Sequence, residues 1–283
     1  LGGGEPTLVL PAMERAHERL AVRLAAEHID LATRVVSNGT CLDERLLAFL
    51  ARPGVDLAVS LDGYGPSHDL HRRFRGTSRG TWNLVSHNLE RCLAAGIVPS
   101  VGATLSEDTC DSLRQLIDWT APRSLPVHVQ CVSEPGCPWR GPIPALADHR
   151  RFSDRLTAAL DEALSALEQR LARGDVVPRL TIDQLNLDEP TFHRCCGIGT
   201  SYLAITEAGH VALCPMLARG EAAPLSDDLI ATAASLLERS SVCRIGSDTD
   251  PCLVCQWFPA CTRGCAAIHE RSDGDASSVS PLC

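Results

Sequence analysis

Residues 31–63 read LATRVVSNGTCLDERLLAFLARPGVDLAVSLDG, and this stretch decides the fold class. Two short apolar runs, residues 31–37 and 55–60, enclose a helical segment, and each run ends in a polar, glycine-containing turn. A strand that leads through a helix into another strand is the βα unit of a parallel sheet. Similar runs at residues 97–104 and 126–132 extend the pattern. The sequence therefore predicts an α/β fold with parallel strands in an open sheet or incomplete barrel.

Apolar residues recur at helical spacing in three segments, residues 12–24, 84–93 and 148–173. Such a stripe buries one face of a helix against a neighbouring element. We expect the third and longest helix to connect two domains. The expected stripes are Met13, Ala16, Leu20 and Leu24 in the first segment, Leu84, Val85, Leu89, Cys92 and Leu93 in the second, and Leu156, Leu160, Leu164, Leu167 and Leu171 in the third.

The composition excludes several classes of protein. With 283 residues, 45% of them apolar, the chain can form two domains with real cores. A net charge of -9 and a pI near 5.6 argue against a nucleic-acid partner, because such proteins carry a basic surface. No apolar run approaches the ~18 residues of a membrane span, and no signal-peptide pattern is present. We expect a cytoplasmic protein with no membrane partner.

Cysteine usage divides the chain, since nine of the 14 cysteines fall within residues 195–283. We predict an α/β domain over residues 1–145, a bridging helix over 146–185 and a cysteine-rich domain over 186–283. The five cysteines before residue 195, together with Cys243, are interpreted as buried or incidental thiols.

The cysteines of the last domain have the spacing of metal ligands. They follow the pattern Cys252-x2-Cys255-x5-Cys261-x3-Cys265, with Cys283 after it and Cys196-x12-Gly209-x4-Cys214 before it. Such short spacings let one turn aim two thiolates at one centre or at neighbouring centres. Seven thiols exceed the needs of one tetrahedral zinc site. A zinc module on the four clustered cysteines and a disulfide framework remain alternatives.

This arrangement resembles the seven-cysteine signature of SPASM domains, which hold two auxiliary 4Fe-4S clusters in radical S-adenosylmethionine enzymes. The resemblance covers residues 196–283 in order and spacing. It implies four ligands for one cluster and three for the other, whose fourth ligand the resemblance does not fix; Cys195 is a candidate for it. The implied ligands are Cys252, Cys255, Cys261 and Cys283 for one cluster and Cys196, Cys214 and Cys265 for the other.

Four short motifs in the α/β region are similar, in their order, to the strand ends of a radical S-adenosylmethionine barrel. They are Gly2-Gly3-Gly4-Glu5-Pro6, Ser37-Asn38-Gly39-Thr40, Ser60-Leu61-Asp62-Gly63 and His68-Asp69-x2-Arg72. The resemblance then spans nearly the whole chain, and it implies a partial TIM-like barrel followed by a small iron-sulfur domain.

The same resemblance implies roles for individual residues in binding S-adenosylmethionine. The backbone of Gly3 and Gly4 would approach the cofactor closely, and Glu5 would accept hydrogen bonds from its ammonium group. Ser60 and Arg72 would bind its carboxylate, and Asn38 would lie beside its ribose or adenine. An ordinary turn at Asn38, a helix cap at Ser60 and a surface ion pair at Arg72 are the structural alternatives.

The resemblance implies an enzyme that modifies a peptide or protein through hydrogen abstraction by a 5'-deoxyadenosyl radical, forming a thioether or carbon-carbon crosslink or maturing the peptide in another way. A reductant such as flavodoxin or ferredoxin would supply the electron. The C-x3-C-x2-C loop that holds the family's catalytic 4Fe-4S cluster occurs nowhere in the 283 residues. We expect it upstream of Leu1, so that this fragment alone is inactive.

Two other functions remain open. Sulfatase-maturating members of the family carry an acidic residue after the cysteine equivalent to Cys214, whereas Pro215 follows here, which disfavours that oxidation. A non-catalytic protein that binds zinc or clusters and interacts with peptides is the alternative of another class.

Overall fold

The computed structural model describes residues 4–131, 149–182, 203–215, 221–240 and 254–255. The chain forms two compact units, Leu1–Val132 with Phe152–Ile182 and Ser133–Arg151 with Asp183–Cys283. The domain boundaries predicted at residues 145 and 185 lie outside the described residues and stay predictions.

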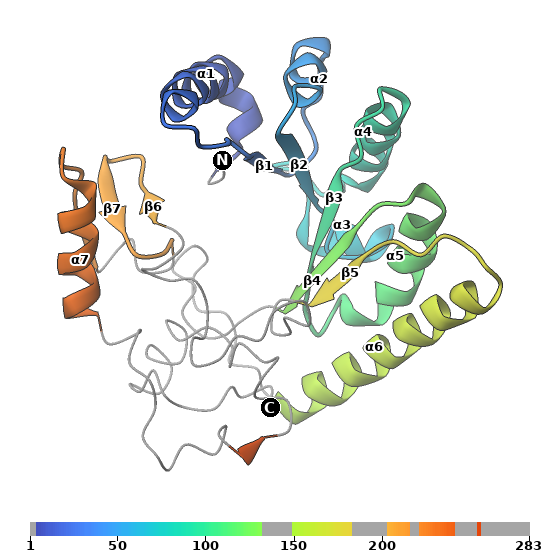
Figure 1. The fold of residues 1–283 in the computed structure, drawn as a ribbon. Helices are drawn as coiled ribbons and strands as arrows, with labels where there is room; N and C mark the ends of the chain where they lie inside the picture. Colours follow the sequence, from blue (N-terminus) through green and yellow to red (C-terminus); the bar gives the residue numbers. More distant parts are fainter. Residues whose placement is uncertain (1–3, 132–148, 183–202, 216–220, 241–253, 256–283) are drawn as a thin grey trace. The chain divides into compact units, whose positions relative to one another are not determined.

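Five parallel strands form the sheet of the first unit (Figure 1). Their order in space equals their order in sequence, and each neighbouring pair is parallel. This confirms the predicted α/β fold, and the last strand is an addition that the sequence analysis did not predict. The strands are β1 (Thr33–Ser37), β2 (Val55–Ser60), β3 (Ser100–Leu105), β4 (Val127–Cys131) and β5 (Leu180–Ile182).

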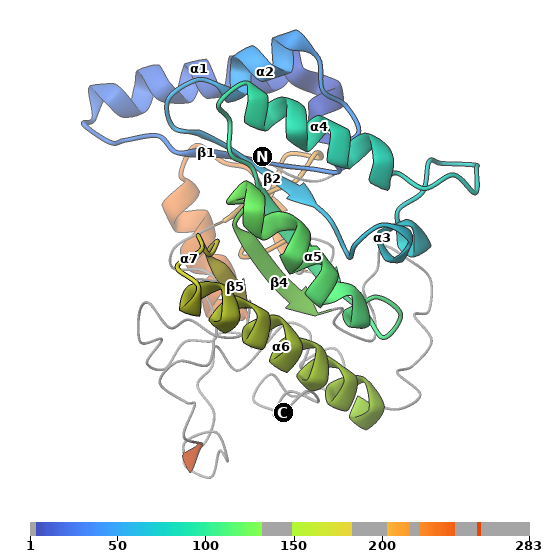
Figure 2. The ribbon, with the colours of Figure 1, turned by 90° about the vertical axis from the view of Figure 1, so that its right-hand side faces the viewer.

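Helices connect the strands, and the longer ones cover one face of the sheet (Figure 2). Short 3-10 turns occupy Pro6–Val9, Cys110–Ser112 and Ala121–Arg123. The helices are α1 (Leu10–Ala26) before β1, α2 (Glu44–Leu50) after it, α3 (Pro66–His71) and α4 (Trp82–Ala94) after β2, α5 (Leu113–Thr120) after β3 and α6 (His149–Ala172) after β4.

The two faces of the sheet differ in chemistry. Alternate strand residues such as Val59, Val101 and Val129 are buried, and Val59 shares a cavity with Val85 and Leu89 of α4. The opposite face is half-buried or exposed and mostly polar. Because both faces of a parallel sheet are usually apolar, this polar face, called the open face below, is suited to binding a ligand. Its residues are Arg34, Val36, Asp56, Ala58, Ser60, Ser100, Gly102, Thr104, His128, Gln130 and Thr181.

The predicted apolar stripes are correct where a helix packs tightly and wrong where it does not. In α4, Val85, Leu89 and Cys92 are buried, and burial raises the pKa of the Cys92 thiol to about 11. In α1, Leu20 is 49% exposed, although it was predicted to lie on the buried face.

The predicted leucine stripe of α6 is wrong at Leu164 and Leu171, which are exposed. Residues four apart advance by about 40° around a helix of 3.6 residues per turn, so the steps of four in this stripe carry Leu164 and Leu171 off the buried face. Alanines let the helix approach its neighbours there. The buried residues of α6 are Phe152, Ala159, Ala163, Ala166 and Leu167.

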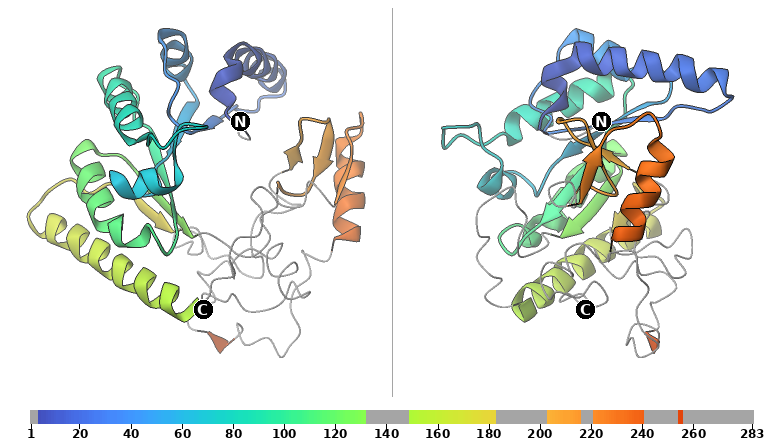
Figure 3. Two further views of the ribbon diagram at one scale, coloured as in Figure 1. Left: turned by 180° about the vertical axis from the view of Figure 1, so that it is seen from behind. Right: turned by 90° about the vertical axis from the view of Figure 1, so that its left-hand side faces the viewer.

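The second unit contains a small antiparallel sheet with a helix against it (Figure 3). Gly209 has a φ of +71° in the turn that joins the first two strands, where its amide donates to the Thr206 carbonyl at 3.0 Å. A left-handed φ favours glycine, which explains the glycine that precedes Cys214 in the sequence motif. The elements are β6 (Ala204–Ile205), β7 (His210–Ala212), β8 (Ala222–Pro224) and α7 (Leu229–Arg239).

Candidate functional site

Two motifs that lie 32 residues apart in sequence meet at the carboxyl end of β1. The Oε1 atom of Glu5 accepts hydrogen bonds from the Ser37 hydroxyl at 2.8 Å and from the amide and hydroxyl of Thr7 at 3.2 and 2.6 Å. Its Oε2 atom accepts from the Asn38 amide at 2.7 Å. Glu5 therefore caps the turn at Pro6–Val9 and ties it to the strand.

The turn after β1 is fixed from within. The Asn38 side-chain oxygen accepts from the amide and the hydroxyl of Thr40 at 2.8 and 2.7 Å, which is an Asx turn. Asn88 of α4 donates to the Gly39 carbonyl at 2.9 Å. The turn that was an alternative reading of Asn38 is thus present, and its side-chain oxygen is already occupied.

Replacing Gly39 by Ala is expected to cost about 2 kcal/mol of unfolding free energy. Gly39 has a φ of +71°, and a Cβ there would lie 2.7 Å from Val59 Cγ1 and 2.9 Å from Val85 Cγ1. Gly76 has a φ of +76° with nothing within 4 Å of an added Cβ, so Gly76→Ala is the matched control at about 1 kcal/mol. Urea unfolding measures both; equal losses would contradict the steric part of this explanation.

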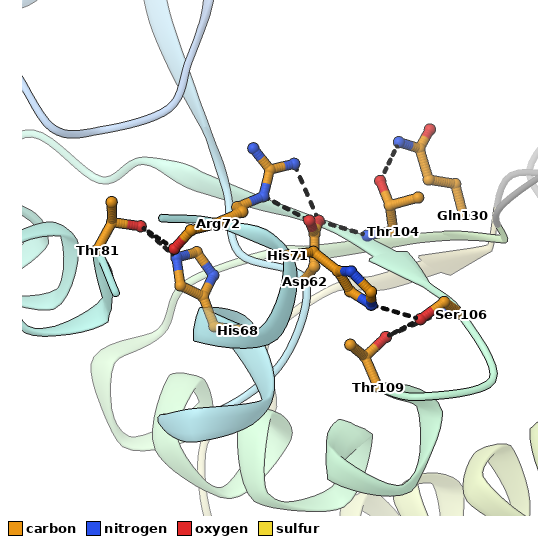
Figure 4. Close-up of polar contacts among 9 residues, drawn as sticks. All are labelled: Asp62, His68, His71, Arg72, Thr81, Thr104, Ser106, Thr109 and Gln130. Carbon is orange, nitrogen blue, oxygen red and sulfur yellow. Dashed lines mark hydrogen bonds and ion pairs between the residues drawn. The ribbon is translucent and has the colours of Figure 1, made fainter. Parts of the chain in front are cut away.

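An ion pair joins the residue two positions beyond β2 to the end of α3 (Figure 4). Arg72 donates through Nε and Nη2 to the two carboxylate oxygens of Asp62, at 2.5 and 3.1 Å. Asp62 is buried, and it also accepts from the Thr104 amide of β3 at 3.1 Å. The Arg72 guanidinium is thereby held at the carboxyl end of the sheet.

Further polar groups surround this pair. Gln130 of β4 donates to the Thr104 hydroxyl at 2.7 Å, and His71 lies 3.3 Å from the Ser106 hydroxyl (Figure 4). On the open face beside them, Ser60 is in register with Gly102. Small side chains therefore stand at the centre of the face and polar ones at its carboxyl edge.

His68 is fully buried beneath Arg72. Its Nε2 atom lies 2.9 Å from the Thr81 hydroxyl, which itself donates to the Arg72 carbonyl at 3.1 Å. Since a hydroxyl has one proton to give, His68 must donate from Nε2, and its Nδ1 atom is an acceptor without a partner among the described residues. Burial, and next the Arg72 charge, lower the pKa of His68 to about 4.

The structure brings together part of the predicted cofactor set. Glu5 and Asn38 meet at the end of β1, while Ser60 and Arg72 belong to the end of β2. Gly4 is described, and it has a φ of +57°. Gly3 lies outside the described residues. Sequence reasoning missed Asp62, Thr104 and Gln130 as partners in the site, although the alternation of polar and apolar residues in Val-His-Val-Gln (127–130) marks one polar strand face.

The predicted cluster ligands are described only in part. Cys214 is buried two residues after β7, and Cys255 is exposed. Within the described ranges, no three His, Cys, Asp or Glu side chains are grouped as metal ligands. In the same ranges, no helix is long and apolar enough to cross a membrane. The predicted ligands outside the described residues are Cys196, Cys252, Cys261, Cys265 and Cys283.

At the level of sequence, no protein-family model and no curated protein matches the chain. Solved structures do match in fold. The structure of anSMEcpe with bound AdoMet and the Cp18Cys peptide has a TM-score of 0.77 at 17% identity, covering 100% of this chain and 79% of the other. That of anSMEcpe with bound AdoMet alone has a TM-score of 0.75 at 16% identity, covering 99% and 77%.

A second protein has the same fold. The structure of Streptococcus suis SuiB bound to the precursor peptide SuiA has a TM-score of 0.66 at 14% identity, covering 98% of this chain and 63% of the other. At these identities the likeness shows the fold alone.

Proposed function

We propose that this chain belongs to a radical S-adenosylmethionine enzyme that modifies a peptide or protein. The observation that carries the proposal is the open polar face with Ser60 and Arg72 at its carboxyl edge. The fold likeness supports it, because anSMEcpe was crystallised with AdoMet and peptides and SuiB with a precursor peptide. In this interpretation the five-stranded sheet is part of an incomplete barrel.

Arg72 and Ser60 are suited to a carboxylate. Of the five N–H groups of a guanidinium, Arg72 uses two on Asp62, which leaves three for a ligand. The Ser60 hydroxyl has no hydrogen-bond partner in the part of the chain that the structure describes. The Arg72 guanidinium and the Ser60 hydroxyl would together donate hydrogen bonds to the carboxylate of S-adenosylmethionine and hold it at the end of β2.

Glu5 has less capacity left. Each carboxylate oxygen offers about two acceptor sites; three donors share those of Oε1, while one donor occupies Oε2 and leaves about one site there. The ammonium group of the cofactor would therefore be accepted at Oε2, and Glu5 would position the turn at the same time.

The proposed cofactors are S-adenosylmethionine, two auxiliary 4Fe-4S clusters on the seven spaced cysteines and a third, catalytic cluster. The cofactor when bound would supply a carbon radical that abstracts hydrogen from the substrate. The C-x3-C-x2-C ligands of the catalytic cluster are not among these 283 residues. A flavodoxin or ferredoxin is the proposed electron donor.

Crosslinking or related peptide maturation is the proposed chemistry. Pro215 follows Cys214, so the acidic residue expected at this position for sulfatase-type oxidation is absent from the sequence. The described residues of the open face include no Glu. The Asp of this face, Asp56, lies at the start of β2, at the opposite end of the strand from Asp62 and the proposed cofactor site.

Binding of S-adenosylmethionine tests the proposal. Using the complete gene product purified without oxygen, we expect saturable binding and, with dithionite, formation of 5'-deoxyadenosine. Arg72→Lys is expected to weaken binding about tenfold, because an ammonium cannot replace the planar fork that contacts Asp62 and the ligand together. Arg19→Lys, on the exposed side of α1, is the control. Absence of binding, or equal affinity in the Arg72 variant, would count against the assignment.

A further inference from the structure

The loop between α3 and α4 concentrates positive charge in an acidic chain. Residues 70–89 contain four arginines and no Asp or Glu, whereas the whole chain has 35 acidic and 26 basic residues other than His. Arg72 is paired with Asp62. The other three, Arg73, Arg75 and Arg79, are exposed.

Hydrogen bonds hold this loop in one conformation. The Phe74 amide donates to the Arg79 carbonyl at 3.0 Å, the Thr77 amide donates to the Phe74 carbonyl at 3.1 Å, and Arg73 and Gly80 form an antiparallel bridge. The Arg79 guanidinium lies over the Phe74 ring, 5.0 Å from its centroid. The loop therefore presents its guanidinium groups from a defined backbone.

None of these three side chains has a carboxylate partner among the described residues, which they share with Arg15, Arg19 and Arg23 of α1 but not with several other arginines of the unit. Arg45 and Arg114, for example, pair with Glu14 and Asp118. Asp69, the acidic residue at the base of the loop, accepts from the Trp82 amide through Oδ1, and Arg73 contacts its backbone carbonyl. The positive charge is left available to an external anion.

We propose that residues 72–80, here called the arginine loop, bind an acidic segment of the peptide substrate. The proposal rests on the function proposed above and specifies its substrate class. The loop starts at Arg72, which Asp62 holds at the carboxyl end of β2.

Peptide binding is favoured over docking of an electron carrier for a geometric reason. A substrate has to reach the open face itself, and the arginine loop adjoins that face through Arg72. An acidic electron carrier is the competing partner for such a basic loop, and its association is measured as a separate outcome below.

Fluorescence anisotropy with two labelled heptapeptides tests the proposal, one containing four glutamates and the other four glutamines at the same positions. We expect the glutamate peptide to bind at low salt at least tenfold more tightly, and the preference to shrink at high salt because surface charges are screened. Neutralising Arg73, Arg75 and Arg79 together should weaken that binding about tenfold, since each exposed ion pair contributes a few-fold. That variant is Arg73→Gln, Arg75→Gln, Arg79→Gln.

The matched control removes three charges from the exposed side of α1 by Arg15→Gln, Arg19→Gln and Arg23→Gln, and it should change the affinity by less than about twofold. An equal loss in both variants, or equal affinity of the wild-type protein for the two peptides, overturns the proposal. So does a loop variant that binds the peptide normally but no longer associates with an acidic flavodoxin.

The loop variant should still bind S-adenosylmethionine. If the wild-type protein does not bind it while the loop dependence persists, the enzymatic role fails and peptide docking stands.

Discussion

Arg72→Met is expected to lower the free energy of unfolding by about 3 kcal/mol. The substitution leaves the Asp62 carboxylate without its cation, and removing one partner of a buried pair costs about 3–5 kcal/mol. The lower end applies because the Arg72 side chain is 29% exposed, while that of Asp62 is 10% exposed. Urea unfolding monitored by circular dichroism measures the change.

A second substitution isolates the cause. Asp62→Asn removes the charge but keeps an acceptor for the Thr104 amide, so the double variant with Arg72→Met should be more stable than Arg72→Met alone. Arg114→Met breaks the exposed pair with Asp118 and should cost less than about 1 kcal/mol. A double variant no more stable than Arg72→Met would show that lost packing, and not the stranded charge, explains the effect.

His68 is expected to make the protein acid-sensitive. Its pKa falls from an ordinary 6.5 to about 4 on folding, so the unfolded chain binds the proton more readily. The stabilisation is complete above pH 6.5 and is lost as the pH falls toward 4. A shift of one pKa unit corresponds to about 1.4 kcal/mol, so the unfolding free energy should fall by about 3 kcal/mol between pH 6.5 and pH 4.

The variant His68→Gln separates this effect from other titrations. Glutamine retains an N–H donor for the Thr81 hydroxyl but carries no proton that titrates. Between pH 7 and pH 4, the unfolding free energy of the wild-type protein should fall by about 3 kcal/mol more than that of the variant. Parallel curves for the two proteins would mean that His68 is not the group responsible.

Local sequence patterns predicted the parallel sheet because its strands are short apolar runs separated by helices. The structure places β2 at Val55–Ser60, as predicted, and begins β1 two residues later than residue 31. The predicted leucine stripe of α6 was wrong at Leu164 and Leu171 because steps of four residues drift around the helix, away from the face that Phe152 and the alanines bury. The strand β5 escaped prediction because three residues give no periodicity.

The candidate site was predictable in its motifs but not in its contacts. The Gly-Glu and Asn-Gly motifs were identified separately, and only folding shows that Glu5 binds the backbone and hydroxyl groups beside Asn38. The pairing of Asp62 with Arg72, ten residues apart, depends on the direction in which α3 leaves the sheet. No local pattern encodes that direction.

Metal analysis of the chain tests most directly whether an iron-sulfur domain accompanies the sheet for which we propose cofactor binding. Iron, zinc and acid-labile sulfide are measured after anaerobic reconstitution, together with the electron paramagnetic resonance spectrum of the reduced protein. We expect about eight irons and eight sulfides per chain, held as two 4Fe-4S clusters. Stoichiometric zinc with negligible iron, in protein isolated and handled without oxygen, would contradict it.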